Sequence, residues 1–530
     1  MPTDCISYQK SGYFTKLMID YLDEKPEIQS FYNRFPKLEN FKAQINEKQQ
    51  NFPDATRNVL VAALENQYEG FKVTEATSNN IKLLEQTTTF TITTGHQLNL
   101  FTGPLYFLYK IVSTINLCAT LKKEYPEHNF VPIYWMATED HDFEEINYFN
   151  FKNVKIKWNK ESNGPVGRLS TTGLNSVLEI FASELSIGQN ANNLKELFEK
   201  SYLKHDNLAA ATRFLANELF GDKGLVILDG DDTTLKQLFI PFIKEELVSK
   251  TSFQIVSKTN SLLEKEYNIQ VNPREINLFY IEDTLRERIL FEDNQYKINN
   301  TKLTFTEKEI LALVDSNPEK FSPNVVLRPL YEEIILPNLC YIGGGGEIAY
   351  WLQLKTTFEA YKITFPILLV RNSVLLTSGK QVQKADKLEL TWADLFSNQQ
   401  ELFTEKTKAF SKFNIDFSQQ KEQLKQQFEK LLEIANQTDK SFIGAVKAQQ
   451  TKQTKGLENL EKRLLKAEKR VHAEKLERII ELQNELFPNQ GLQERKANFS
   501  EFYLENGKEL IELLFENLKP LETNFTVITF

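Results

Sequence analysis

The first part of the chain alternates short apolar segments with longer amphipathic ones. Buried strands are predicted where apolar, β-branched and aromatic residues are concentrated, namely at residues 88–93, 130–136, 225–229 and 365–370. Helices are predicted over residues 105–121 and around 209–220. Strands separated by helices favour a parallel sheet in an α/β layered fold. In such folds a ligand crevice lies at the carboxyl ends of the strands.

Two stretches interrupt this alternation, at about residues 150–207 and 251–323. Neither keeps the rhythm of strand and helix, so we expect both to be insertions into the core domain. The core domain itself is predicted over residues 1–385. The remainder, residues 386–530, is expected to form an α-helical coiled-coil domain with a C-terminal segment.

The composition of residues 417–486, rich in Glu, Lys, Gln and Leu, is typical of long helices. Two runs repeat with alternating spacings of four and three: Leu424, Phe428, Leu431, Ala435, Thr438 and Phe442, then Leu457, Leu460, Leu464, Ala467 and Val471. This heptad spacing predicts an antiparallel or dimeric coiled-coil arm. The break between the runs, at residues 444–456, is compatible with a hairpin tip or with a weak joint in one long helix. The strand-like end, residues 524–530, is expected to dock on the body.

The composition narrows the class of protein. A chain of 530 residues with 41% hydrophobic residues has enough apolar material for several folded units. Its net charge of -9 argues against a protein that coats nucleic acid. The 3 cysteines share no metal-binding spacing, so we expect no zinc site and a reducing, cytoplasmic location. No apolar run is long enough to span a bilayer, and no signal peptide is visible, so no membrane partner is expected.

The first candidate motif, at residues 93–110, joins a predicted strand to a predicted helix through a glycine-rich turn. Backbone amides at a helix start, with glycine allowing close approach, bind phosphate or carboxylate groups. The candidate nucleotide-binding residues are Gly95, His96, Gln97, Gly103 and Lys110. A tight structural connection is the alternative interpretation, because the motif is neither a Walker A loop nor a dinucleotide-binding fingerprint.

The second motif follows the strand at residues 130–136. It gathers carboxylates around one histidine: Glu139, Asp140, His141, Asp142, Glu144 and Glu145. Such a cluster can hold a divalent metal, bind an ammonium group or act as an acid/base pair. A charged surface loop is the alternative. Without further histidines or cysteines nearby, magnesium carried by a nucleotide is favoured over zinc or another metal held by the protein.

The third motif lies at residues 328–351. Its four consecutive glycines, Gly343, Gly344, Gly345 and Gly346, admit a ligand or another backbone closely. Glu347 opens the following helix, and Arg328 suits a carboxylate or a phosphate. A flexible loop is the alternative interpretation. Cys340, in an apolar stretch without a local base, is interpreted as a buried structural thiol.

The segments TGHQLNLFTGPLYFLYK, PIYWMATEDHDFEEIN and RPLYEEIILPNLCYIGGGGEIAYWLQLK, in this order, resemble the cysteine ligases of bacillithiol biosynthesis, the BshC family. The resemblance extends through the coiled-coil region after Arg371 and covers nearly the full length. It implies a Rossmann-type core with connecting insertions and a coiled-coil arm that forms a homodimer. It also implies the addition of L-cysteine to glucosaminyl malate, which gives bacillithiol. The chain departs from the family pattern at His96, where glutamine is expected, and at Gly345, where proline is expected.

The resemblance also implies roles for the candidate residues. ATP with magnesium would activate the cysteine carboxyl group, as an acyl-adenylate or an acyl-phosphate, and would lie near the first motif. The catalytic candidates are Asp140, His141, Asp142 and Glu347. The substrate-binding candidates are Glu139, Arg328, Gly343, Gly344, Gly345 and Gly346. The alternative function is a non-catalytic, dimeric scaffold that binds a nucleotide or a metabolite.

Overall fold

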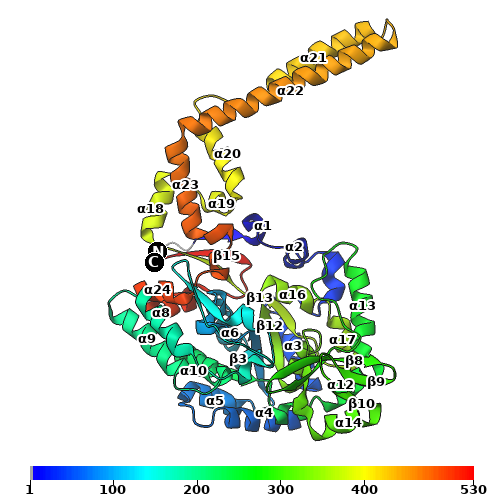
Figure 1. Cartoon of the computed structure of the whole chain (residues 1–530), viewed down its shortest axis with the longest axis vertical. Coiled ribbons are helices and arrows are strands. Elements are labelled where there is room, and N and C mark those ends of the chain that lie inside the picture. The colour runs from blue at the N-terminus through cyan, green and yellow to red at the C-terminus, as the bar shows by residue number, and fades with distance from the viewer. Residues whose placement is uncertain (1–3) are drawn as a thin grey trace.

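The computed structural model describes residues 4–530 and consists of a layered body from which a long arm of paired helices projects (Figure 1). Residues near both ends of the described chain lie side by side where the arm leaves the body, because β1 (Asp4–Ser7) pairs with β15 (Asn524–Thr529) (Figure 1). Within residues 4–530, no helix combines the length and the apolar character needed to cross a membrane.

A five-stranded parallel sheet forms the centre of the body, in the order β13-β12-β2-β3-β6. The strands are β2 (Thr89–His96), β3 (Asn129–Met136), β6 (Val226–Asp229), β12 (Asn338–Gly343) and β13 (Ile367–Val370). The four predicted strands and the α/β fold class are confirmed. The fifth strand, β12, was not predicted from the sequence. It lies between β2 and β13 and is buried along its whole length.

Helices cover both faces of this sheet (Figure 1). Helix α6 (Tyr106–Glu124) packs on β2 and β3, which confirms the helix predicted over residues 105–121. Helix α3 (Asn40–Asn51) packs on β12, and α10 (Leu208–Phe220) confirms the helix predicted around residues 209–220. Cys118 and Cys340 are buried in one apolar cluster between sheet and helices, where burial raises the pKa of both thiols. A buried structural role therefore fits Cys340.

The stretches that interrupt the alternation fold as separate additions to the sheet. The first holds β4 (Tyr148–Phe151), β5 (Val154–Lys157), α8 (Leu174–Glu184) and α9 (Gln189–Tyr202). The second opens with α13 (Thr251–Leu263) and contains α14 (Glu307–Ser316). It also holds an antiparallel sheet in the order β10-β9-β8-β7-β11, made of β7 (Leu278–Glu282), β8 (Leu285–Glu292), β9 (Gln295–Ile298), β10 (Thr304–Phe305) and β11 (Phe321–Pro323).

The arm is an antiparallel hairpin of α21 (Ser418–Ala435) and α22 (Lys440–Val471), followed by α23 (Ala473–Leu486) (Figure 1). Its tip lies at residues 436–439, where the Asp439 side chain accepts a hydrogen bond from the Ser441 amide. The predicted break at residues 444–456 is wrong, because α22 runs through both of its glycines without interruption. Most of the helix between and after these glycines consists of strong helix formers, and an isolated glycine is tolerated in such a helix.

The C-terminal segment returns to the body, as expected. Strand β15 (Asn524–Thr529) pairs antiparallel with β1 (Asp4–Ser7) and parallel with β14 (Ser373–Thr377). Helix α24 (Phe499–Asn506) packs on α9 of the first insertion, and α25 (Glu509–Asn517) packs on α6. The sequence after the arm therefore completes the body, because it adds β15 to a second, three-stranded sheet with β1 and β14 and packs α25 on α6.

Candidate functional site

The three motifs meet at one cavity of about 380 Å³ at the carboxyl ends of β2, β3 and β12. The sequence-predicted residues that line it are Gly95, His96, Gln97, Lys110, Asp140, Arg328, Gly344, Gly345, Gly346 and Glu347. Parallel strands end at the same edge of a sheet, so motifs that follow different strands come together there. Glu139, His141, Asp142, Gly103 and Gly343 are not among the lining residues.

An ion pair between a buried lysine and a half-buried glutamate joins two of the motifs across the cavity. The Lys110 ammonium on α6 lies 2.6 Å from Glu347 Oε2 on α16 (Gly345–Trp351), and it also donates to the Gly95 carbonyl at 2.7 Å. Glu347 accepts further hydrogen bonds from the Tyr341 hydroxyl (2.8 Å) and the Gly344 amide (2.9 Å). Burial raises the pKa of Glu347, but Lys110 and these hydrogen bonds outweigh it and hold that pKa below its ordinary value. Glu347 is therefore an ionised group with a fixed orientation.

His96 lies at the end of β2 and is 7% exposed. Its ring packs against Tyr106 and Phe107, at centroid distances of 5.4 and 5.0 Å. Burial, and then the nearby charges of Lys110 and Arg371, hold the pKa of His96 well below its ordinary value. Its Nε2 atom is buried without a hydrogen-bond partner among the described residues. His96 is thus a neutral imidazole at the cavity wall with one unused hydrogen-bonding position.

Asp140 is held by groups from two other segments. Gln97 Nε2 donates to its Oδ2 at 3.4 Å, and Arg286 Nη1 from β8 lies 3.4 Å from its Oδ1. Burial opposes ionisation, but the hydrogen bond with His141 and the Arg286 charge lower the pKa of Asp140. Arg286 also donates to His141 Nδ1 at 2.6 Å. No sequence motif pointed to this arginine, because it comes from the second insertion.

Asp140, His141 and Asp142 each offer one ligand atom, and these atoms lie within 4.8 Å of one another. A cation bound there would lie beside the Arg286 guanidinium, which already bonds His141 and faces Asp140. Positive charge next to the cluster disfavours a resident metal ion. His141 and Asp142 lie outside the cavity lining, on the more exposed side of the loop.

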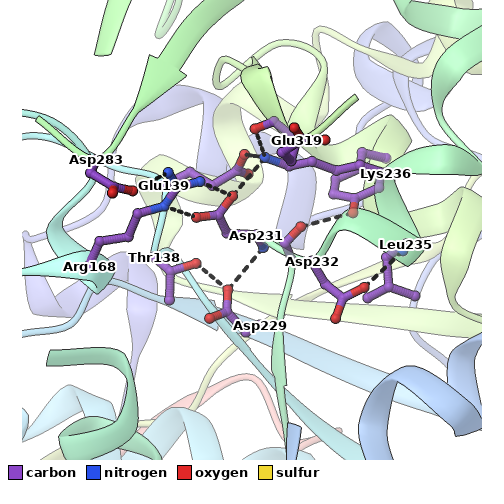
Figure 2. A network of polar contacts seen from close by, with 12 residues as sticks. Thr138, Glu139, Arg168, Asp229, Asp231, Asp232, Leu235, Lys236, Asp283 and Glu319 are labelled. Carbon is purple, nitrogen blue, oxygen red and sulfur yellow. Dashed lines mark hydrogen bonds and ion pairs between the residues drawn. The ribbon is translucent and has the colours of Figure 1, made fainter. Parts of the chain in front are cut away.

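Glu139 belongs to a different group of residues, which Figure 2 shows. Its Oε1 pairs with Lys236 at 2.7 Å, and Lys236 also pairs with Asp231 at 2.8 Å. Asp231 accepts two hydrogen bonds from Arg168, at 2.8 and 3.0 Å (Figure 2). The side chain of Glu139, which was predicted to bind the substrate, thus faces Lys236 and does not line the cavity. Neighbouring side chains of this loop point in different directions. Through its ion pair, the Glu139 side chain connects the loop to the segment after β6 and to both insertions.

Two of the predicted glycines have structural roles away from the cavity. Gly103 has a φ of +62°, and a Cβ there would come within 2.5 Å of Asn99 Cβ. Its carbonyl accepts a hydrogen bond from Asn498 at 2.6 Å. A Cβ at Gly343 would lie 2.9 Å from Glu347 Cβ, so this glycine allows α16 to start directly after β12. Neither position is open to a nucleotide or a substrate in this structure.

Two family models together match nearly the whole chain. The N-terminal Rossmann-like domain of "Bacillithiol biosynthesis BshC" matches residues 1–372, and its C-terminal coiled-coil domain matches residues 374–530. The chain belongs to the BshC family. A relative from Flavobacterium johnsoniae is 64% identical over 529 residues and covers 100% of both chains. One from Christiangramia forsetii is 56% identical over 538 residues, covering 100% of this chain and 99% of its own. Both are named "Putative cysteine ligase BshC".

The BshC coiled-coil domain also contributes to the cavity. Arg371, just after β13, forms two hydrogen bonds with Glu494, at 2.7 and 3.1 Å, and both side chains are buried. The neighbouring Arg495 lines the cavity, and the Arg371 guanidinium lies 5.0 Å from the centre of the Tyr106 ring. The sequence could not pair Arg371 with Glu494, because 123 positions separate them.

The cavity of this BshC protein suits an anionic ligand with an amino group. Arg328 and Arg495 have no ion pair with a carboxylate among the described residues, which leaves their charge for a ligand. Asp140 and Glu347 provide ionised carboxylates for an ammonium group. A cavity of this volume with a few convergent polar groups is typical of small-molecule sites.

Proposed function

We propose that this protein is a ligase that joins the carboxyl group of L-cysteine to the amine of glucosaminyl malate, the last step of bacillithiol biosynthesis. The observation that carries the proposal is the meeting of the three family motifs at one cavity. The names of relatives that match the chain from end to end support it. The bond formed would be an amide, and the bond broken would join the cysteine carbonyl carbon to the oxygen that leaves with the activating adenylate or phosphate. Both changes depend on positioning and on charge stabilisation.

The charges of the cavity suggest an arrangement of the substrates. Arg328 would bind a carboxylate of the malate part, and Asp140 would bind the cysteine ammonium group. Glu347 would accept a hydrogen bond and then the proton from the attacking amine. Gly344, Gly345 and Gly346 line the same wall, where the absence of side chains leaves room for the sugar.

We propose ATP as the co-substrate. His96, Trp351 and Arg371 line the cavity, and each has one buried nitrogen atom without a hydrogen-bond partner within residues 4–530, as a hydrogen-bonding, anionic ligand requires. Gly95, Gln97 and Lys110 lie on the same side as His96 and would complete the nucleotide contacts. ATP would supply the activation of the cysteine carboxyl group. Magnesium would arrive with the phosphates, since Arg286 disfavours a protein-held cation at the Asp140 loop.

We also propose that the arm pairs with a second copy of the chain. Only a small apolar cluster of Phe428, Ala435 and Val446 is buried within the hairpin. Leu460 and Val471 of the predicted seam are 54% and 71% exposed. Apolar residues at heptad spacing that the hairpin does not bury are available to a partner helix.

The deciding experiment is thiol and precursor profiling by mass spectrometry in a strain that lacks the gene. We expect bacillithiol to disappear and glucosaminyl malate to accumulate, and the wild-type gene to reverse both effects. Asp140→Asn should fail to restore bacillithiol, because the amide cannot pair with the substrate ammonium or with Arg286. Asp315→Asn, at an exposed carboxylate of α14, is the matched control and should restore it.

Normal bacillithiol in the deletion strain would refute the ligase. Loss of the precursor together with bacillithiol would place the protein earlier in the pathway. Nucleotide binding without turnover, measured with all substrates present, would favour the alternative, a non-catalytic scaffold.

A further inference from the structure

One carboxyl group at the cavity wall has no role in the site described above. Glu332 lies on α15 (Arg328–Ile335), one helical turn after Arg328, and it lines the same cavity. The residue is 3% exposed, and its Oε1 atom is buried without a hydrogen-bond partner among residues 4–530. It also takes part in no ion pair within that range. A buried polar atom without a partner at a cavity wall is available to a ligand.

The charged and titratable groups around Glu332 come from four elements: Arg328 and Glu333 on α15, Glu347 on α16, Lys48 on α3 and Tyr341 on β12. The cation of Lys48 is bound by Glu333 at 2.6 Å, and that pair is fully buried. Glu347 is bound by Lys110. Burial, and then the Glu333 carboxylate, raise the pKa of Glu332 well above its ordinary value, against the opposing charge of Arg328. The surroundings of Glu332 therefore favour its protonated form.

The protonation of Glu332 decides what Arg328 can do. Positions four apart lie on one face of a helix, so an ionised Glu332 would be well placed to neutralise the Arg328 guanidinium. A protonated carboxyl group lacks that charge and still offers a donor and an acceptor. The positive charge of Arg328 then remains for an incoming anion.

We propose that Glu332 contacts the substrate as an uncharged hydrogen-bonding residue and thereby leaves the Arg328 guanidinium to a substrate carboxylate. The inference deepens the proposed function and rests on it, since the malate part of glucosaminyl malate supplies the carboxylate. Glutamine has nearly the same shape as protonated glutamate and also has a donor and an acceptor. Leucine fills the same space without either.

The first test is titration calorimetry of glucosaminyl malate into the full-length protein and its variants. We expect Glu332→Gln to bind within about threefold of the wild type. We expect Glu332→Leu to bind about tenfold more weakly, the loss of one hydrogen bond. Arg328→Met should weaken binding further, because it removes the charge. Equal losses in the Gln and Leu variants, or none in the Leu variant, would overturn the inference.

The outcomes separate the inference from the proposed function. A wild-type protein that does not bind glucosaminyl malate would refute the proposed substrate. Wild-type binding that Glu332→Leu leaves unchanged would refute only the role of Glu332. Infrared difference spectra of wild type minus Glu332→Gln at neutral pH test the charge directly. We expect the carbonyl stretch of a protonated carboxylic acid, and a carboxylate signal in its place would overturn the inference.

Discussion

At the scale of single residues, opposite charge states are assigned to two glutamates in one cavity. Glu347 has an ammonium group and two other donors within hydrogen-bonding distance, so its ionised form is stabilised. Glu332 has no cationic partner among residues 4–530, and burial together with the Glu333 carboxylate raises its pKa and favours the protonated form. Environment, rather than residue type, sets this difference. Both residues belong to the third motif, but the sequence of that motif predicted a role only for Glu347.

Glu347→Gln removes the ionised partner of the buried Lys110. We expect the free energy of unfolding at pH 7 to fall by about 1–3 kcal/mol, the range for hydrogen bonds to charged groups. The pKa of Glu347 is lowered in the folded state, so its stabilisation is present above its unfolded pKa of about 4.3 and is lost as the pH falls through the folded value. Urea unfolding from pH 7 downward should therefore show the difference between variant and wild type shrinking below about pH 4.

Glu359→Gln is the control, since Glu359 forms an exposed pair with Lys355 and should change stability by less than about 0.5 kcal/mol. A difference for Glu347→Gln that stays constant down to the lowest pH at which the protein folds would contradict the assigned charge state.

At the scale of elements, local patterns predict whether a segment forms a helix or a strand. They do not predict the order of the strands in a sheet or the position of a turn. Residues 105–121 form the predicted helix because their apolar face has a helical period and a sheet to pack on. The arm is helical, as its composition indicates. Its turn lies at residues 436–439 rather than at the glycines, because capping by Asp439 supplies the local signal. Glycine spacing was the wrong guide in a helix with so many strong helix formers.

The two arm glycines give a test at this scale. Gly444→Ala and Gly456→Ala should each stabilise the arm by about 0.5–1 kcal/mol, because both positions are helical and a Cβ there meets no atom within 4 Å. Thermal unfolding followed by circular dichroism measures the effect. Gly103→Ala is the opposite control, since its positive φ and Asn99 should make that variant less stable. Destabilisation by the arm substitutions would show that α22 is not continuous.

At the scale of the whole molecule, the C-terminal segment connects the arm to the cavity. Strand β15 pairs with strands from both ends of the core, and Glu494 binds Arg371 beside the cavity. The coiled-coil domain is therefore joined to the core domain by strand pairing and by an ion pair, and not by the chain alone. If the arm pairs with a second copy of the chain, residues on the outside of the hairpin would form the contact.

Leu460→Glu combined with Val471→Glu should convert a dimer to a monomer, because the change places two like-charged carboxylates on each copy in an apolar seam. Analytical ultracentrifugation gives the mass of both forms. Thr451→Glu, at an exposed polar position of α22, is the control and should stay dimeric. A wild-type monomer, or a double variant with unchanged mass, would contradict pairing through this face.

Sequence patterns alone were enough to predict the α/β class, four of the five central strands, two of the helices that pack around them and the motifs that meet at the cavity. These features depend on periodicity, on turn residues and on the meeting of parallel strand ends at one edge, all of which are local or topological. Tertiary packing was needed to place β12 beside β2, to turn Glu139 toward Lys236, to bring Arg286 to Asp140, and to set Arg371 and Glu332 in the cavity wall. Those outcomes depend on which distant segments pack together, and burial and charge at the packed positions then set the state of each side chain.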